Sequence, residues 1–164
     1  FHVFPVFHNK AFTKELSPWL MFDYAAPKQF EPSYERRGVG QHHRLYTSEP
    51  ALNELDHEAG GFKWIDHEDS ENSLFSFLRR SRDGETIIAI VNATPVLREG
   101  YRLGVPDGGF YEEVFNSDAE IYGGSNQGSG GGIPTQQQEA HGKPHSIEIT
   151  IPPLGTVFLK RRAV

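Results

Sequence analysis

The tryptophan at position 64 stands two residues before a run of acidic side chains that begins at Asp66. A flat aromatic ring stacks on the C–H faces of a sugar, and a neighbouring carboxylate accepts hydrogen bonds from sugar hydroxyl groups. Trp64 and Asp66 are therefore the candidate carbohydrate-binding residues. Packing in a hydrophobic core is the competing role for Trp64, and residue type alone favours packing. Tyr101 and Tyr122 are weaker candidates of the same kind.

The acidic run itself first raises the question of a metal site, since hard cations take clustered carboxylate oxygens. It lacks the glycine-containing twelve-residue pattern of a calcium loop, and we expect a solvated acidic loop. Adjacent His42 and His43 would point about 100° apart on a helix, so they do not readily share one metal. The eight histidines supply no His-x-x-x-His pair in a helical pattern, and the sequence predicts no metal site.

Catalytic patterns are not found either. Glu112 and Glu113 are neighbours on an expected strand, where successive side chains point to opposite faces, so they do not form the facing carboxylate pair of a glycosidase. No Gly-x-Ser-x-Gly nucleophile turn occurs. The glycine-rich stretch 123–132 lacks the Lys-Ser/Thr ending of a phosphate loop. We expect a long, mobile connection there, and we assign no catalytic residue and no cofactor.

Composition limits the partners. The chain has 164 residues, a formal net charge of −6 and no cysteine, so it has neither disulfides nor thiolate metal ligands. It shows no basic stripe for nucleic acid, and the short basic runs 79–82 and 160–162 are expected to be solvated strand ends. No apolar run approaches the roughly 18 residues of a membrane span. We expect neither nucleic acid nor a membrane as a binding partner, and we expect a cytoplasmic location.

Because the first residue is Phe1, we expect the chain to be a fragment or a processed product.

The elements that must position Trp64 are short strands separated by turns. Asp83-Gly84 is a strong hairpin signal, and 106–109 (PDGG) is a second one. Seven strands with this spacing predict an all-β fold, an antiparallel β-sandwich. The expected strands are 62–65, 73–80, 86–91, 101–105, 110–115, 147–151 and 156–160.

The first 46 residues follow another pattern. They are aromatic but irregular, interrupted by Pro27 and Pro32, and 41–46 would close a helix before the break at Pro50. We therefore divide the chain into 1–46, an irregular and partly helical segment, and 47–164, the β-sandwich domain.

From about residue 45 to its end the sequence resembles the C-terminal part of bacterial-type glycogen branching enzymes, members of the alpha-amylase superfamily. The matching segments are 59–66 (AGGFKWID), 72–80 (NSLFSFLRR), 92–102 (NATPVLREGYR), 116–118 (NSD), 122–126 (YGGSN), 145–147 (HSI) and 152–156 (PPLGT). Residues 25–44 depart from the amphipathic helix that the family has at that point.

The resemblance implies an alpha-amylase-type C-terminal domain, preceded by the end of a (β/α)₈ barrel. It implies a parent enzyme that cleaves an α-1,4-glucan and transfers the chain to a 6-hydroxyl group. The family's catalytic residues belong to the barrel, and none is carried over to this chain. The implied partners are α-glucan and the barrel of the same protein, and sugar contact at Trp64 becomes as plausible as packing. The alternative is a free-standing carbohydrate-binding or interaction module.

Overall fold

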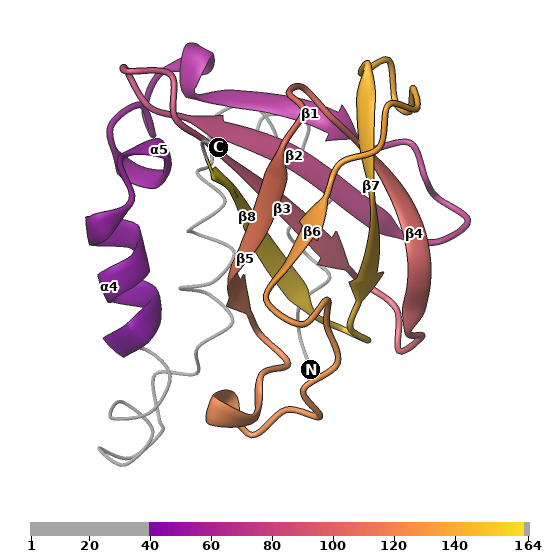
Figure 1. Cartoon of the computed structure of the whole chain (residues 1–164). Coiled ribbons are helices and arrows are strands. Elements are labelled where there is room, and N and C mark those ends of the chain that lie inside the picture. Colours follow the sequence, from indigo (N-terminus) through magenta and orange to yellow (C-terminus); the bar gives the residue numbers. More distant parts are fainter. Residues whose placement is uncertain (1–39, 163–164) are drawn as a thin grey trace.

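The computed structural model describes the backbone of residues 40–162 and the side chains of residues 44–162 (Figure 1). Its strands form an antiparallel β-sandwich, which confirms the expected fold class. The strands are β1 (Phe62–Asp66), β2 (Leu74–Arg80), β3 (Thr86–Asn92), β4 (Arg98–Val105), β5 (Phe110–Asn116), β6 (Gly132–Pro134), β7 (His145–Ile151) and β8 (Thr156–Arg162). All seven expected strands are present, and β6 is an additional short one.

The strands form two sheets, a large one in the order β1-β2-β3-β8-β5-β6 and a small one of β4 and β7. The main core lies between them. Isoleucines that alternate along β7 contribute to it because side chains of one strand face the same side at every second position. The central strand β3 is apolar on both faces, as predicted: Ile88 and Ile90 enter this core, whereas Ile87 and Ala89 face the other side of the large sheet.

A helical segment covers that outer face of the large sheet. It comprises α4 (Gly40–Ser48), α5 (Pro50–Asn53) and the short 3₁₀ helix η3 (Ala59–Gly61), at the left and top of Figure 1. Pro50 occupies the first turn of α5, where its missing N–H costs nothing. Leu52 is buried and packs with Phe77 and Phe158 in a second core cluster. The helical segment therefore belongs to the folded unit.

Three ion pairs fasten this segment to the strands or the turn that follows β2. They are Lys160–Glu49 at 2.7 Å, Arg79–Asp56 at 2.6 Å and Arg82–Glu58 at 2.7 Å. The Arg79 side chain is only 3% exposed, and its guanidinium also donates to the carbonyl of Leu52. The expectation that run 79–82 is entirely solvated is thus wrong at Arg79. Arg79 shares the face of Phe77, and the helical segment, distant in sequence, covers that face.

The turn at 106–109 does not form the expected hairpin. It links β4 of the small sheet to β5 of the large sheet, and β4 pairs with β7 instead. A Pro-Asp-Gly-Gly sequence specifies a sharp reversal of the backbone, but it does not specify which strands then pair. The Asp83-Gly84 turn, in contrast, joins the paired strands β2 and β3, as predicted.

The glycine-rich stretch 123–132 is a connection between strands, as expected, but it is anchored by hydrogen bonds. The carboxylate of Asp118 accepts from the backbone N–H groups of Ser125 and Gln127, and Ser129 N–H donates to Glu113. A side chain at Gly124 would overlap the backbone of Asp118. The stretch is glycine-rich partly because its backbone must pass this close to its anchor.

The division of the chain at residue 46 remains a prediction. Helix α4 ends at Ser48, just before the break at Pro50, as expected, and it runs across that boundary. The remainder of the expected irregular segment, residues 1–39, lies outside the described residues. Among the described helices, none is both long and apolar enough to span a membrane.

Candidate functional site

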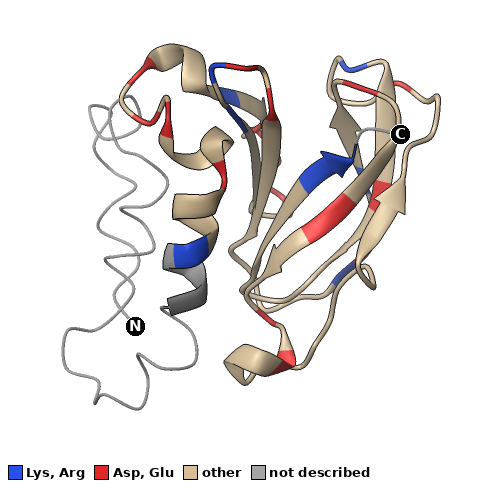
Figure 2. Ribbon diagram, turned by 60° about the vertical axis from the view of Figure 1, so that its left-hand side comes forward, with Lys and Arg blue, Asp and Glu red and all other residues tan. Residues whose placement is uncertain are grey.

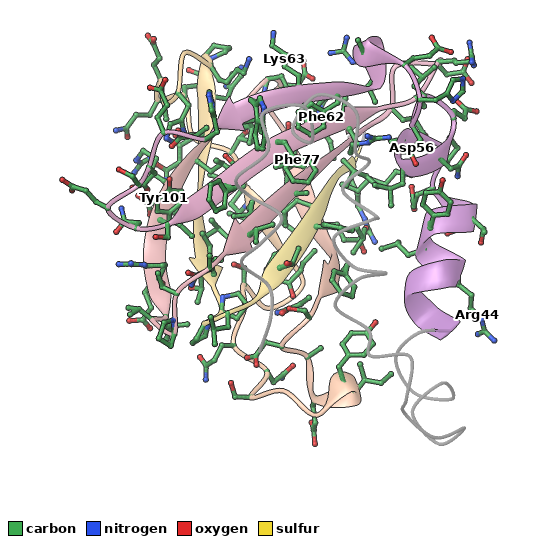
Figure 3. All side chains as sticks on the ribbon, turned by 180° about the vertical axis from the view of Figure 1, so that it is seen from behind. Arg44, Asp56, Phe62, Lys63, Phe77 and Tyr101 are labelled. Carbon is green, nitrogen blue, oxygen red and sulfur yellow. The ribbon has the colours of Figure 1, made fainter. Side chains whose placement is uncertain are left out.

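Trp64 is held in an aromatic cluster on the edge strand β1. Its ring meets Phe62 edge-on at 5.0 Å and Phe77 edge-on at 5.8 Å, and it stacks on His67 at 5.3 Å. Phe62 and Trp64 share a face because they are two residues apart, and Phe77 lies opposite Trp64 on β2. Figure 3 shows Phe62 and Phe77 next to each other on this face.

The tryptophan nonetheless remains 37% exposed. Neighbours fix the ring without enclosing it, so the two roles weighed from the sequence, packing and contact, are both compatible with this position. An aromatic ring held in one orientation loses little conformational entropy when a ligand stacks on it. Trp64 therefore has the geometry of a preorganised stacking surface.

Asp66 does not share this face. The pairing of β1 with β2 shifts between Trp64, which lies opposite Phe77, and Asp66, which lies opposite Ser76. Ile65 is the extra residue of this bulge, and one extra residue turns every following side chain to the other face. The structure thus places the two residues singled out in the sequence on opposite faces of the edge strand.

Asp66 joins a polar cluster between the β1–β2 loop, β4 and the loop before β7. Its carboxylate lies 3.4 Å from Nε2 of His141, and Nδ1 of His141 accepts the backbone N–H of Gly104 at 3.0 Å. The His141 ring stacks on Tyr101. No spacing in the sequence pointed to His141, because it is brought to Asp66 only by the packing of one sheet on the other.

Tyr101 and Asp69 complete this polar cluster. The hydroxyl of Tyr101 donates to Asp69 at 3.1 Å, and both burial and the Asp69 charge raise the pKa of the phenol. Burial alone would raise the pKa of Asp69, but hydrogen bonds from Asn72 and Tyr101 outweigh it and hold that pKa below its usual value. These hydrogen bonds attach the acidic loop to β4. The Asp69 carboxylate is already occupied by the donors of Asn72 and Tyr101.

Tyr122 lines a separate open cavity of about 340 Å³ between α4 and β5. The cavity is lined by Arg44, Leu45, Ser48, Val114, Phe115 and Tyr122. The Tyr122 ring packs on Phe115 with ring centres 5.7 Å apart, and burial raises the pKa of its hydroxyl. This cavity carries no carboxylate pair, so it offers a contact surface without acid–base chemistry.

The acidic run raised the possibility of a metal site, which the positions of the described side chains test. Within residues 44–162, no group of three or more histidine and carboxylate side chains is arranged to hold a metal ion. The side chains of His42 and His43 lie outside the described residues. Asp66 and Asp69 are instead engaged with His141, Asn72 and Tyr101.

Comparison with known proteins places these features in a family. Residues 64–162 match the family model described as "Alpha amylase, C-terminal all-beta domain". The chain is 51% identical over 128 residues to a protein of Methylobacillus flagellatus named "1,4-alpha-glucan branching enzyme GlgB", covering 76% of this chain and 18% of that protein.

Two further relatives carry the same name. The protein of Aromatoleum aromaticum is 52% identical over 124 residues, covering 76% of this chain and 20% of the relative. That of Halothermothrix orenii is 47% identical over 143 residues, covering 87% and 22%. The chain thus spans about a fifth of the length of the curated relatives it matches.

Proposed function

Because the chain belongs to the family of alpha-amylase C-terminal all-beta domains, we propose that it is this domain of a 1,4-alpha-glucan branching enzyme. The observation that carries the proposal is the identity of about one residue in two to proteins of that name over most of this chain. A shared sandwich fold by itself would leave the function open. Nothing in the comparisons favours the free-standing module.

The parent enzyme would cleave an α-1,4-glucan and transfer the released chain to a 6-hydroxyl group. A retaining mechanism with two carboxylates suits such a transfer, because a sugar hydroxyl can capture the covalent glycosyl-enzyme intermediate in place of water. We place those carboxylates in a catalytic barrel of the same protein and assign none to this chain. We also keep the cytoplasm as the location, which fractionation of source cells would test.

The domain's own part in this function is to support the barrel and to contact glucan at Trp64. The support for this contact is a ring that Phe62, Phe77 and His67 hold in place while 37% of the side chain stays exposed. Asp66 faces the other side of β1, so it would contact a glucan separately from Trp64.

The branching proposal is tested by comparing two proteins on amylose. The purified chain should form no α-1,6 branches, whereas the natural full-length protein should form them. Branches are counted after debranching, by the reducing ends released. Branching by a contaminant-free sample of this chain would contradict the placement of the catalytic groups, and an inactive full-length protein would contradict the branching function.

The glucan contact is tested with Trp64→Ala in the full-length protein. We expect weaker retention in native gels containing amylopectin, because the stacking surface is lost. Lys63→Ala is the matched control, since Lys63 is the exposed neighbour on the same strand. Equal retention of Trp64→Ala and wild type, with unchanged thermal midpoints, would show that Trp64 only packs.

A further inference from the structure

Phe110 is a second aromatic residue, besides Trp64, whose ring packs against the protein while part of the side chain stays exposed to solvent. It is the first residue of β5, lies opposite Arg162 of β8 and Pro134 of β6, and is 37% exposed. A Cβ built at Gly132 would come within 2.5 Å of Cε1 and 2.6 Å of Cζ of this ring. The ring therefore lies directly against the backbone of Gly132, and glycine is required there because any side chain would displace it.

A charged, planar pair stands next to this ring. Nε and Nη2 of Arg162 each donate to the Glu112 carboxylate at 2.6 Å. Glu112 is two residues from Phe110 on β5 and therefore on the same face. The hydrogen bonds from Arg162 hold the pKa of Glu112 below its ordinary value, so the carboxylate is ionised at neutral pH. Figure 2 shows the basic end of β8 beside the acidic segment of β5.

These groups have the composition of a sugar-binding surface. Hydrogen bonding to Arg162 leaves the Glu112 carboxylate with acceptor capacity for sugar hydroxyls, since a carboxylate has about four lone-pair sites. Among the described residues, no acceptor binds Nη1 of Arg162, so its N–H groups are available as donors. The fixed ring of Phe110 supplies the apolar surface on which the C–H face of a sugar stacks.

We propose that Phe110, Glu112 and Arg162 form a second α-glucan contact site, separate from Trp64. The ligand class rests on the proposed function, whereas the site rests on the geometry of these three residues. Trp64 and Phe110 lie on two strands of the same sheet, β1 and β5, which are four strand spacings, or about 19 Å, apart. Trp64→Ala therefore tests whether the second site binds glucan when the first has been removed.

The test is a titration of the chain with maltoheptaose, followed by the backbone amide NMR shifts of residues 108–112, 132 and 160–162. We expect saturable shifts at these positions in the wild type and in Trp64→Ala. Phe110→Leu should weaken this binding about fivefold or more, because leucine still covers Gly132 but offers no flat face. Phe110→Tyr keeps the ring and should bind like the wild type. Val96→Ala, an exposed apolar residue elsewhere, is the control.

The outcomes separate this site from the proposed function. Unchanged binding in Phe110→Leu, or no shift at these amides while those around Trp64 move, would overturn the second site and leave the glucan contact at Trp64 standing. No shift at either site would overturn both contacts, whereas branching by the full-length protein would still support the enzyme assignment. Loss of binding in Phe110→Leu at an unchanged thermal midpoint supports the site, since a purely structural role would lower the midpoint.

Discussion

Among residues 44–162, Arg79 is the only charged residue that is buried. It lies under the helical segment at 3% exposure, paired with Asp56 and bonded to the carbonyl of Leu52. Arg79→Met should lower the free energy of unfolding by about 2–3 kcal/mol, because it removes the guanidinium that lies 2.6 Å from the partly buried Asp56 carboxylate. Urea unfolding at pH 7 measures this.

Arg82→Met is the matched control for that experiment. Arg82 pairs with Glu58 at nearly the same distance, but its side chain is 60% exposed. Exposed pairs contribute little, so this variant should change the free energy of unfolding by less than about 0.5 kcal/mol. Similar losses in both variants would mean that burial does not distinguish the two pairs.

Asp69 should make the stability of the domain depend on pH in the acid range. Its pKa is lower in the folded chain than in the unfolded one, so its contribution is present above the unfolded value of about 3.9 and is lost as the pH falls through the folded value. Asp69→Asn should cost about 1 kcal/mol at pH 7, through the weakened bonds from Asn72 and Tyr101, and much less at pH 2.5.

Unfolding curves of the wild type and Asp69→Asn at pH 7, 4 and 2.5 supply the measurement. The expected result is a difference between the two proteins that shrinks steadily with acid. A difference that stays constant over this range would show that the effect of Asp69 comes from packing and not from its charge.

At the scale of elements, the junction of α4 and α5 is attached to β8 through Lys160. Its ammonium group lies 2.7 Å from Glu49 and 3.6 Å from Glu85, and the hydrogen bond to Glu49 raises its pKa. Lys160→Glu should loosen the helical segment while the sheets persist. Hydrogen exchange should therefore quicken at residues 45–54 and not in β3.

The double variant Lys160→Glu with Glu49→Lys provides the check on that prediction. Exchanging the charges restores an attractive pair, so protection of residues 45–54 should recover at least in part. If the single variant exchanges like the wild type, or the double variant exchanges faster than the single one, the attachment does not operate through this pair.

The elements also show where local patterns are informative. Strand β7 was predictable because Ile147, Ile149 and Ile151 alternate with polar residues, a pattern set by the geometry of a single strand. The partners of β4 were not predictable, since a turn at 106–109 fits a hairpin and a crossing between sheets equally well. Strand β6 was missed because three residues are too few to establish a period.

At the scale of the whole molecule, we expect the sandwich to depend on its helical cover. Ala51 and Leu52 are almost entirely buried against the outer face of the large sheet. A chain that begins at Gly60 should expose this apolar face, bind a hydrophobic dye and unfold at a lower urea concentration than the full chain. Equal midpoints and no dye binding would show that the sheets are stable without the cover.

The sequence by itself determined the fold class, the positions of seven strands and the family, because strand periodicity, turn chemistry and family motifs are properties of neighbouring residues. Only the tertiary structure decided that β4 pairs with β7, that Arg79 is buried, and that a bulge at Ile65 turns Asp66 away from Trp64. It also brought Phe110, Gly132 and Arg162 together from three strands. These features depend on contacts between residues far apart in the chain, which no local pattern specifies.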